Sequence, residues 1–532
     1  TFSLIKSESK NDKNIISKAR KLIWVNHNAK NESNLQNSLD NYDAHFNKIL
    51  EIEKELYGLL DRHIITETVR QKEQELSRAI DAFLEKMPKT FDPFTGGGAI
   101  PLESARLGCK SYGNDINPVA HIIQKASLEF PQKFGKRLIY TKNEFIKKYG
   151  IEYLINWCKL NSRHYLDENL IIDIPNILSF DVKFYAEKIL SNVEKLISDN
   201  YKVDLSKGEL LAYYWVRFAI CSNPSCKAEV PLLKQFYLSK VRGRSTNDWV
   251  YIKPVINNNK IEFTINKGIC EIDGFVKRGS FVCPCCGNMT HEKDLKDQFK
   301  EKKIKEKIVC DIYQKNGKKY YYISDNYLID DFQQDENLIP EEDLPNETKI
   351  TNTILFGYSK WKELFNDRQL NHIVCLIKEL KMYDLYKNND QYSIAITTYL
   401  GILIDRIIAR NTSFGIWHTL QETIEHPFGR QAIFMLFDFP EMNPFSSLSS
   451  SDKNQLSQII DYIETESTTF FSTCKNTSSG DVNQFEPKYL DSVITDPPYY
   501  DAIAYGDISD FFYVWLKKSI VNYAVSWKVE IR

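Results

Sequence analysis

Apolar residues recur every three or four positions between about Tyr42 and Met87, which is the spacing of one face of a helix. This spacing predicts one or two amphipathic helices there, ending at Pro88, because proline does not fit the interior of a helix. The residues before position 50 are polar, rich in Asn and Lys, and only weakly patterned. We therefore expect residues 1–88 to form a mainly helical N-terminal region.

The middle of the chain changes its hydrophobic period several times. Residues 121–210 have a helical pattern, residues 232–323 have the character of strands, and helices resume over residues 360–408. Residues 330–347 are acidic, contain proline and have little apolar content, which predicts a surface linker. The whole pattern is typical of an α/β protein.

Glycines follow a short apolar run in the sequence FDPFTGGG at residues 91–98. The pattern predicts an entry strand, then a helix over residues 100–107, then a second strand at residues 111–113 that leads to Asp115. Glycines let the backbone approach a ligand, a helix N-terminus favours anions, and an acid after the next strand accepts hydrogen bonds from ribose hydroxyls. The arrangement predicts a nucleoside site on a doubly wound sheet. A tight turn without a ligand is the alternative.

A second apolar run ends in VITDPPYY at residues 493–500. The exocyclic amine of a nucleobase is a poor nucleophile because its lone pair is delocalised into the ring. Two acceptors placed about the nitrogen, the Asp496 carboxylate and the Pro497 carbonyl, would draw that lone pair out of conjugation. Pro497 and Pro498 would fix the backbone, and Tyr499 would stack on the extruded base. The sequence predicts a clamp for a flipped-out base, with a simple strand-ending turn as the alternative.

Cysteine spacing predicts a metal site in the middle of the chain. Two pairs, Cys221 with Cys226 and Cys283 with Cys286, lie about sixty residues apart. Four thiolates suit a tetrahedral, structural Zn²⁺, which has no open catalytic position. Buried cysteines without metal are the alternative. The additional ligand candidates, each weaker, are Cys270, Cys285 and His291.

Composition narrows the class of protein. The chain has 532 residues and a net charge of -2, so a DNA contact must come from local basic patches and not from an overall positive charge. No apolar run reaches the ~18–20 residues that span a bilayer, so we expect no membrane partner. Eleven scattered cysteines favour a reducing compartment, and we predict a cytoplasmic protein.

Three stretches, FDPFTGGG, NDINPVA and TDPPYYDAIAYGDISDFFYVWL, resemble the adenine-specific DNA methylases that contain a zinc ribbon. These are large bacterial and archaeal enzymes linked to restriction or phage defence. The resemblance covers most of residues 89–516. It implies a Rossmann-like methyltransferase core, interrupted by a large insertion with a zinc ribbon and a helical segment, and S-adenosyl-L-methionine as the methyl donor.

The resemblance also implies roles for individual residues. Asp115 would lie on the donor's ribose, and Asp481 would accept from its adenine amine, although an ordinary loop acid is an equal alternative for Asp481. The implied cofactor-binding residues are Asp92, Pro93, Phe94, Thr95, Gly96, Gly98, Asp115, Asn117 and Asp481. The implied catalytic residues are Asp496, Pro497, Pro498 and Tyr499, and the implied zinc ligands are Cys221, Cys226, Cys283 and Cys286.

The implied reaction is methylation of the N6 amine of a flipped adenine in double-stranded DNA, with other proteins of a defence system as further partners. The implied domains are an N-terminal region (1–88), a first part of the core with the cofactor turn (89–130), an insertion for target recognition (131–465), and a second part of the core with Asp-Pro-Pro-Tyr (466–532). Within the insertion we expect the zinc ribbon at about 215–320 and the helical segment at 348–465.

Two alternatives stay open. One is an amino-methyltransferase that acts on RNA or on the N4 amine of cytosine. The other is a non-catalytic DNA-binding scaffold of a defence complex. The intact Asp-Pro-Pro-Tyr argues against the scaffold, whereas the short run of residues after it, which departs from the family pattern in VNYAVSWKVEIR, argues for it.

Overall fold

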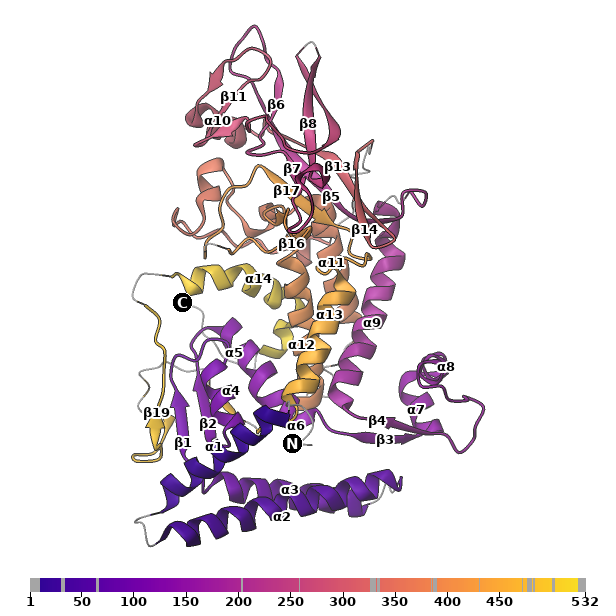
Figure 1. The fold of residues 1–532 in the computed structure, drawn as a ribbon, viewed down its shortest axis with the longest axis vertical. Helices are drawn as coiled ribbons and strands as arrows, with labels where there is room; N and C mark the ends of the chain where they lie inside the picture. Colours follow the sequence, from indigo (N-terminus) through magenta and orange to yellow (C-terminus); the bar gives the residue numbers. More distant parts are fainter. Residues whose placement is uncertain are drawn as a thin grey trace.

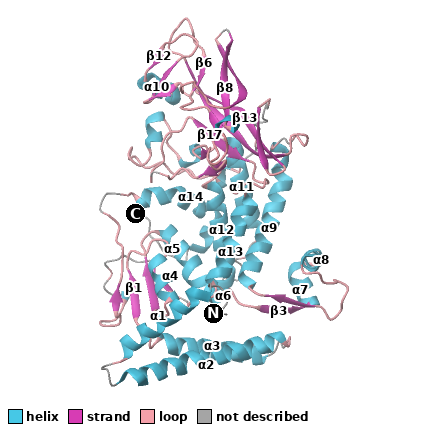
Figure 2. Cartoon of the chain, in the orientation of Figure 1, coloured by secondary structure: helices cyan, strands magenta, loops and turns pink. Residues whose placement is uncertain are grey.

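The computed structural model of the chain describes residues 10–29, 34–63, 67–201, 204–257, 259–325, 332, 335–383, 385, 390–429, 431–470, 472–475, 481, 484–499 and 503–524. The protein is a mixed α/β structure with both parallel and antiparallel sheets (Figures 1 and 2). The predicted α/β class is confirmed at this level. None of the described helices is both long and apolar enough to cross a membrane.

Three helices precede the first sheet: α1 (Lys10–Asn28), α2 (Leu35–Asp61) and α3 (Glu67–Leu84). Helices α2 and α3 lie side by side at the bottom of Figure 1. Their buried faces carry Ile49, Leu56 and Phe83, and Trp24 of α1 stacks on Phe83 with ring centroids 5.2 Å apart. The residues at helical spacing are the ones that are buried, so the predicted helices are confirmed, although α2 begins earlier than the pattern indicated.

A four-stranded parallel sheet joins two parts of the chain that are far apart in sequence. Its strands are β1 (Lys89–Asp92), β2 (Lys110–Asn114), β18 (Thr473–Lys475) and β19 (Ser492–Val493), in the spatial order β18-β2-β1-β19. Helix α4 (Ala99–Arg106) connects β1 to β2, and α5 (Pro118–Gln124) follows β2. Phe91 pairs with Tyr112 on one side and with Val493 on the other. The two sequences that stood out, FDPFTGGG and VITDPPYY, therefore lie on adjacent strands.

Strand β19 is shorter than the apolar run that precedes Asp496, but hydrogen bonds to β1 continue just beyond both ends of the strand. The Ile494 N–H donates to the Phe91 carbonyl at 2.9 Å, and the Lys89 N–H donates to Asp491 Oδ2, 402 positions away, at 2.8 Å. Just before β19, the ring of Phe485 lies edge-on to Phe91, with centroids 4.9 Å apart. Backbone pairing and ring packing together fix the approach to Asp496.

The segment that follows α5 is a helical arm that also contains strands. Its elements are the π-helical turn Lys125–Glu129, α6 (Phe130–Phe134), β3 (Leu138–Thr141), α7 (Lys142–Tyr149), α8 (Ile151–Leu160), β4 (Ile171–Ile174) and α9 (Ile177–Ile197). Strands β3 and β4 pair antiparallel and share a small core with Phe145, Leu154 and Phe184. Helices dominate as predicted. The strand pair was missed because four residues are too few to display a period of two.

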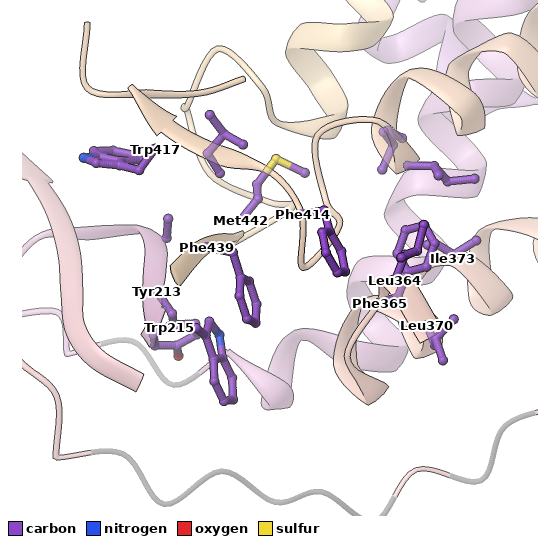
Figure 3. Packing of buried hydrophobic residues seen from close by; sticks show 14 of the residues in the cluster. Tyr213, Trp215, Leu364, Phe365, Leu370, Ile373, Phe414, Trp417, Phe439 and Met442 are labelled. Atoms are coloured by element: carbon purple, nitrogen blue, oxygen red, sulfur yellow. The ribbon is translucent and has the colours of Figure 1, made fainter. Parts of the chain in front are cut away.

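An antiparallel sheet and a set of short hairpins occupy the upper part of Figure 1. The main sheet has the order β14-β13-β5-β17, with β6 paired to β5, and β7-β8-β9 and β10-β11-β12 form separate sheets. The elements are β5 (Glu209–Ile220), β6 (Glu229–Pro231), β7 (Tyr237–Ser239), β8 (Val250–Asn257), β9 (Lys260–Lys267), β10 (Val276–Lys277), β11 (Ser280–Val282), β12 (Met289–Thr290), α10 (Glu292–Lys300), β13 (Lys305–Lys315), β14 (Lys318–Ile323) and β17 (Asp438–Met442). Strand β5 is buried along most of its length, and its Trp215 stacks on Phe439 of β17 at 5.9 Å (Figure 3).

Long helices connect the upper and lower parts of the molecule (Figure 1). They are α9, α11 (Asp367–Met382), α12 (Gln391–Ile408) and α13 (Asp452–Glu466), and the hairpin β15 (Ile416–His418) and β16 (Thr423–Glu425) lies between α12 and β17 in sequence. The last described helix, α14 (Tyr505–Ala524), packs against them: Phe511 and Trp515 contact the ring of Phe365, and a Cβ on Gly401 would lie 2.8 Å from Ile520. Helix α14 follows the Asp-Pro-Pro-Tyr segment in sequence, and its apolar side chains are buried in the same hydrophobic cluster as those of α11 and α12.

The acidic segment before α11 is not a surface linker where the structure describes it. Leu338, Ile339 and Leu344 are buried in the main hydrophobic cluster. Glu342 forms an ion pair with Lys517 of α14. The prediction was wrong because a few well-placed apolar side chains decide whether a segment packs, even where charged residues outnumber them.

Candidate functional site

A cavity of about 1020 Å³ lies where β1, β2 and the residues after β19 meet α14. Its lining includes most of the residues that the sequence predicted: Asp92, Phe94, Thr95, Gly96, Asp115, Asn117, Asp496, Pro497, Pro498 and Tyr499. Its volume is at the upper end of the ~300–1,000 Å³ typical of small-molecule sites. The fold thus brings the glycine turn and the Asp-Pro-Pro-Tyr segment to one cavity.

The turn after β1 is held by hydrogen bonds to its own backbone and to β2. Asp92 is buried, and its Oδ1 accepts from the Phe94 N–H at 3.0 Å. The Thr95 hydroxyl donates to the Asp92 carbonyl at 2.7 Å and accepts from the Asn114 N–H at 3.1 Å. The Thr95 N–H donates to the Asn114 carbonyl at 3.0 Å. These bonds join the carboxyl ends of two adjacent parallel strands, so the shape of the turn is set before any ligand arrives.

Asp115 links the end of β2 to the glycine turn. Its Oδ2 accepts from the Gly96 N–H at 2.9 Å, and its Oδ1 accepts from the Asn117 N–H at 2.8 Å. Burial raises the pKa of Asp115 and outweighs these two backbone hydrogen bonds, which favour the charged form. Gly96 has φ of 54°, in the left-handed region where glycine carries no penalty. The carboxylate therefore supports the turn as well as facing the cavity.

The Asp-Pro-Pro-Tyr segment lies open on the other side of the cavity. Asp496 is exposed, and the Tyr499 side chain is 69% exposed. Both residues nevertheless line the cavity, together with Pro497 and Pro498. A carboxylate, a proline-restricted backbone and an open aromatic ring are thus available to a ligand in the same space as Asp92 and Asp115.

Three of the predicted cofactor residues are not in the lining. Gly98 is the N-cap of α4 with φ of 100°, and a Cβ there would meet Leu128 at 3.0 Å, so packing accounts for this glycine. Pro93 contributes its carbonyl, which accepts from Asn114 Nδ2 at 3.4 Å. Asp481 is described only as an isolated position, and the Ser479-Gly480 that precedes it lies outside the described residues.

Several lining residues had no predicted role. From α14 and the turn before it come Ile503, Tyr505, Gly506, Ile508, Ser509, Asp510 and Phe512, and from the insertion come Phe428 and Gln431. The α14 residues belong to a stretch that was quoted for its resemblance but given no function. Phe428 and Gln431 belong to FGRQAIFMLFDFPEMNPF, a further stretch that resembles the same family but was given no function.

The four predicted zinc ligands form a compact cluster far from this cavity. The Sγ atoms of Cys221, Cys226, Cys283 and Cys286 all lie within 4.8 Å of one another. The separation is 3.7 Å between Cys221 and Cys286 and 3.8 Å between Cys226 and Cys283. Thiolates around Zn²⁺ at ~2.3 Å in a tetrahedron are ~3.8 Å apart, whereas a disulfide requires ~2.05 Å. The cluster is therefore positioned to hold a metal ion and fits structural Zn²⁺.

Local geometry explains why this spacing forms a cluster. The two pairs follow strands β5 and β11, and Gly287, with φ of 73°, donates its N–H to the Cys283 carbonyl at 2.8 Å. The backbone N–H of Asn288 lowers the pKa of Cys286 to about 7, whereas burial raises the pKa of Cys221 above the usual thiol value. The three weaker candidates, Cys270, Cys285 and His291, are not part of the cluster.

Comparison with known proteins identifies no relative of this chain. No family model, no curated protein and no solved structure matches this chain. Functional argument therefore rests on the cavity and on the cysteine cluster.

Proposed function

We propose that this chain is an S-adenosyl-L-methionine-dependent DNA methyltransferase that modifies the N6 amine of adenine in a restriction or phage-defence system. One observation carries the proposal. A glycine turn with Asp92 and Asp115 lines the same cavity as Asp496, Pro497 and Tyr499, although some four hundred residues separate the two segments. Parallel pairing of β1 with β19 places both segments at one edge of the sheet, where their carboxylates and the Tyr499 ring border the same cavity.

The strand order supports a Rossmann-like core. Taking the four parallel strands in chain order, the spatial order is 3-2-1-4, as in one half and the centre of a doubly wound nucleotide-binding sheet. In such sheets the ligand binds beyond the carboxyl ends of the strands where the order reverses, here between β1 and β19. The glycine turn follows β1, and the clamp follows β19.

The cavity suits a positively charged nucleoside donor. Each charged residue in its described lining is an acid: Asp92, Asp115, Asp496 and Asp510. S-Adenosyl-L-methionine supplies a methyl group on a positively charged sulfonium, which an acidic cavity attracts. Asp115 accepts from the backbone N–H groups of Gly96 and Asn117, and the ribose hydroxyls would be further donors to this carboxylate. Asp92, Thr95 and Gly96 would border the methionine part.

The clamp would act on the target amine. Asp496 and the Pro497 carbonyl would each accept a hydrogen bond from one amine N–H, which draws the nitrogen lone pair out of the ring as the N–CH3 bond forms; one of the two amine protons then leaves the nitrogen. Tyr499, with its exposed ring, stacks on the flipped base, a contact worth ~1–3 kcal/mol in other proteins. Transition-state stabilisation of this kind appears in turnover and not in donor affinity.

The cysteine cluster has a structural part in the proposal. A four-sulfur site offers no open position, so Zn²⁺ there would stabilise the ribbon and take no part in methyl transfer. We assign the ribbon and the rest of the insertion to recognition of double-stranded DNA or of a partner protein.

The decisive experiment is methylation by purified protein with labelled S-adenosyl-L-methionine. Matched duplex DNA, RNA and cytosine-only substrates are compared, and digested nucleosides are identified by mass spectrometry. N6-methyladenine in DNA, lost in Asp496→Ala, is the expected result. A labelled methyl group in RNA, or on the N4 amine of cytosine, would change the proposed substrate to RNA or to cytosine. If the protein binds DNA but neither methylates it nor binds the donor, the enzyme proposal is wrong and the non-catalytic DNA-binding scaffold is supported.

A further inference from the structure

One wall of the cavity belongs to neither of the two predicted segments. Phe428 and Gln431 lie in the connection between β16 and β17, well inside the insertion, yet both line the cavity. We call these two residues the insertion wall. They are the point at which the insertion reaches the proposed reaction centre.

The Phe428 ring is held in place by the helix that follows the clamp. It lies edge-on to Phe511, with centroids 5.1 Å apart and planes at 79°, and is tilted at 42° to Phe512 at 5.4 Å. Phe428 is half-buried, so part of the ring is available to the cavity. A ring fixed by two neighbours loses little freedom when it binds a ligand.

Gln431 has an uncommon, left-handed backbone conformation. Its φ is 55°, in the left-handed region that residues other than glycine seldom adopt. Its N–H donates to the Phe428 carbonyl at 3.0 Å, which ties the two residues of the wall together. Among the described residues other than glycine that have positive φ, Gln431 is the one that lines this cavity. The Gln431 side chain is exposed where it borders the cavity.

The wall is anchored immediately beyond Gln431. Ile433 is buried, and its N–H donates to the Ile350 carbonyl at 2.7 Å. The Met435 N–H donates to Asn352 Oδ1 at 2.6 Å. These bonds attach the residues just after Gln431 to the segment around Ile350 and Asn352.

The chemistry of the wall matches a flat heterocycle. The cavity already has open aromatic rings in Phe94, Tyr499 and Tyr505. Phe428 adds a further ring from a different part of the chain. A glutamine amide offers a donor and an acceptor side by side, the complement of an adenine amine and its neighbouring ring nitrogen.

We propose that Phe428 and Gln431 form a purine-binding wall, in which Phe428 contacts the ring and the Gln431 amide reads its edge. The proposal rests on the proposed function, because that function places two purines in the cavity, the donor's adenine and the target base. The wall makes the insertion a direct determinant of what the active site accepts.

The test uses the full chain and two probes. S-Adenosyl-L-homocysteine, titrated by calorimetry, reports on the donor's adenine, and a duplex with 2-aminopurine in place of one adenine reports on the flipped base by its fluorescence. Phe428→Leu keeps apolar packing on Phe511 but removes the aromatic face. Gln431→Gly removes the amide and relieves the left-handed backbone. Phe434→Leu, an exposed phenylalanine outside the lining, is the matched control.

Both wall variants are expected to weaken the same probe by about fivefold or more, the equivalent of ~1 kcal/mol for a lost stacking or hydrogen-bonding contact. The probe affected identifies which purine the wall holds. Gln431→Gly should also raise the unfolding temperature, since the strain is removed. If Phe428→Leu and Gln431→Gly both bind the two probes with wild-type affinity, the purine-binding role of Phe428 and Gln431 is refuted, whereas the proposed function is not affected. A wild-type chain that binds neither probe overturns both.

Discussion

The Asn117 side chain donates from Nδ2 to Ser509 Oγ at 2.8 Å, across 392 positions of sequence. Asn117 is the N-cap of α5, where its Oδ1 also accepts from the N–H groups of Val119 and Ala120. Ser509 lies in the first turns of α14, after the clamp. One side chain thus caps the helix that follows β2 and bonds to the helix that follows Asp-Pro-Pro-Tyr. Asn117 was predicted to bind the cofactor, and the structure gives it this joining contact at the cavity.

Substitutions at Asn117 should separate its two contacts. Asn117→Asp keeps an oxygen that caps α5 but removes the donor to Ser509, whereas Asn117→Ala removes both. We expect Asn117→Ala to lower the free energy of unfolding by ~1–2 kcal/mol, with a smaller loss in Asn117→Asp. Chemical denaturation measures both. Equal stability of Asn117→Ala and wild type would show that the contact contributes nothing.

Asp115→Ala should weaken donor binding by ~1–3 kcal/mol, the range for hydrogen bonds to a charged group. The variant loses the proposed ribose contact and the bond that holds the Gly96 N–H. Calorimetry with S-adenosyl-L-homocysteine measures the effect, and Asp248→Ala, an exposed acid outside the cavity, is the control. Unchanged affinity in Asp115→Ala removes this residue from the donor site.

Asp496→Ala should reduce methylation turnover by several orders of magnitude and leave donor affinity near that of wild type. Because Asp496 is exposed, the unfolding temperature should not change. Tyr499→Phe keeps the stacking ring and should be mild, whereas Tyr499→Ala should impair capture of the base. The measurement is N6-methyladenine in the DNA of cells that express each variant. Full modification by Asp496→Ala would refute the clamp.

The cysteine cluster should bind one Zn²⁺ per chain. Replacing Cys283 and Cys286 together with Ser should abolish metal binding and lower the unfolding temperature, since metal-binding energy contributes to folding. Cys270→Ser and Cys285→Ser are matched controls outside the cluster and should retain metal. Elemental analysis of freshly purified protein gives the stoichiometry. A metal-free wild type, or a double variant with wild-type zinc, contradicts the assignment.

Asp405 of α12 should make stability depend on pH. Burial raises its pKa well above the usual carboxyl value, and its Oδ1 has no hydrogen-bond partner among the described residues. Since the folded-state pKa exceeds that of the unfolded chain, its favourable contribution is complete below about pH 4 and is lost as the pH rises through the folded-state value. Asp405→Asn should therefore gain stability over wild type as the pH rises, by on the order of 1–3 kcal/mol at neutral pH.

Thermal unfolding of wild type and Asp405→Asn from about pH 4 to about pH 8 measures this dependence. The exposed Asp248→Asn is the control. A difference between Asp405→Asn and wild type that is constant across the range, or that shrinks as the pH rises, would show that Asp405 does not titrate as its burial indicates.

Local features of the fold could be predicted from the sequence because neighbours along the chain produce them. The three-to-four spacing of Ile49, Leu56 and their neighbours predicted the N-terminal helices, and the glycines after Phe91 predicted the turn between β1 and α4. The spacing of the cysteines predicted the ligand set, and Gly287 shapes the turn of the second pair, but the meeting of the two pairs depends on tertiary structure. Short strands such as β3 and β4 were missed, since four residues display no period.

The shared cavity was decided by tertiary structure. The residues of each segment predicted a turn and a clamp, but only the pairing of β1 with β19 placed Asp92 and Asp496 around one space. The burial of Leu338 in an acidic segment, the packing of α14 on α11 and α12, and the approach of Phe428 to the cavity could not be located from local sequence. The physical reason is the same in each case: hydrophobic burial between distant segments is set by the sum of many contacts across the fold, and no short stretch of sequence contains that sum.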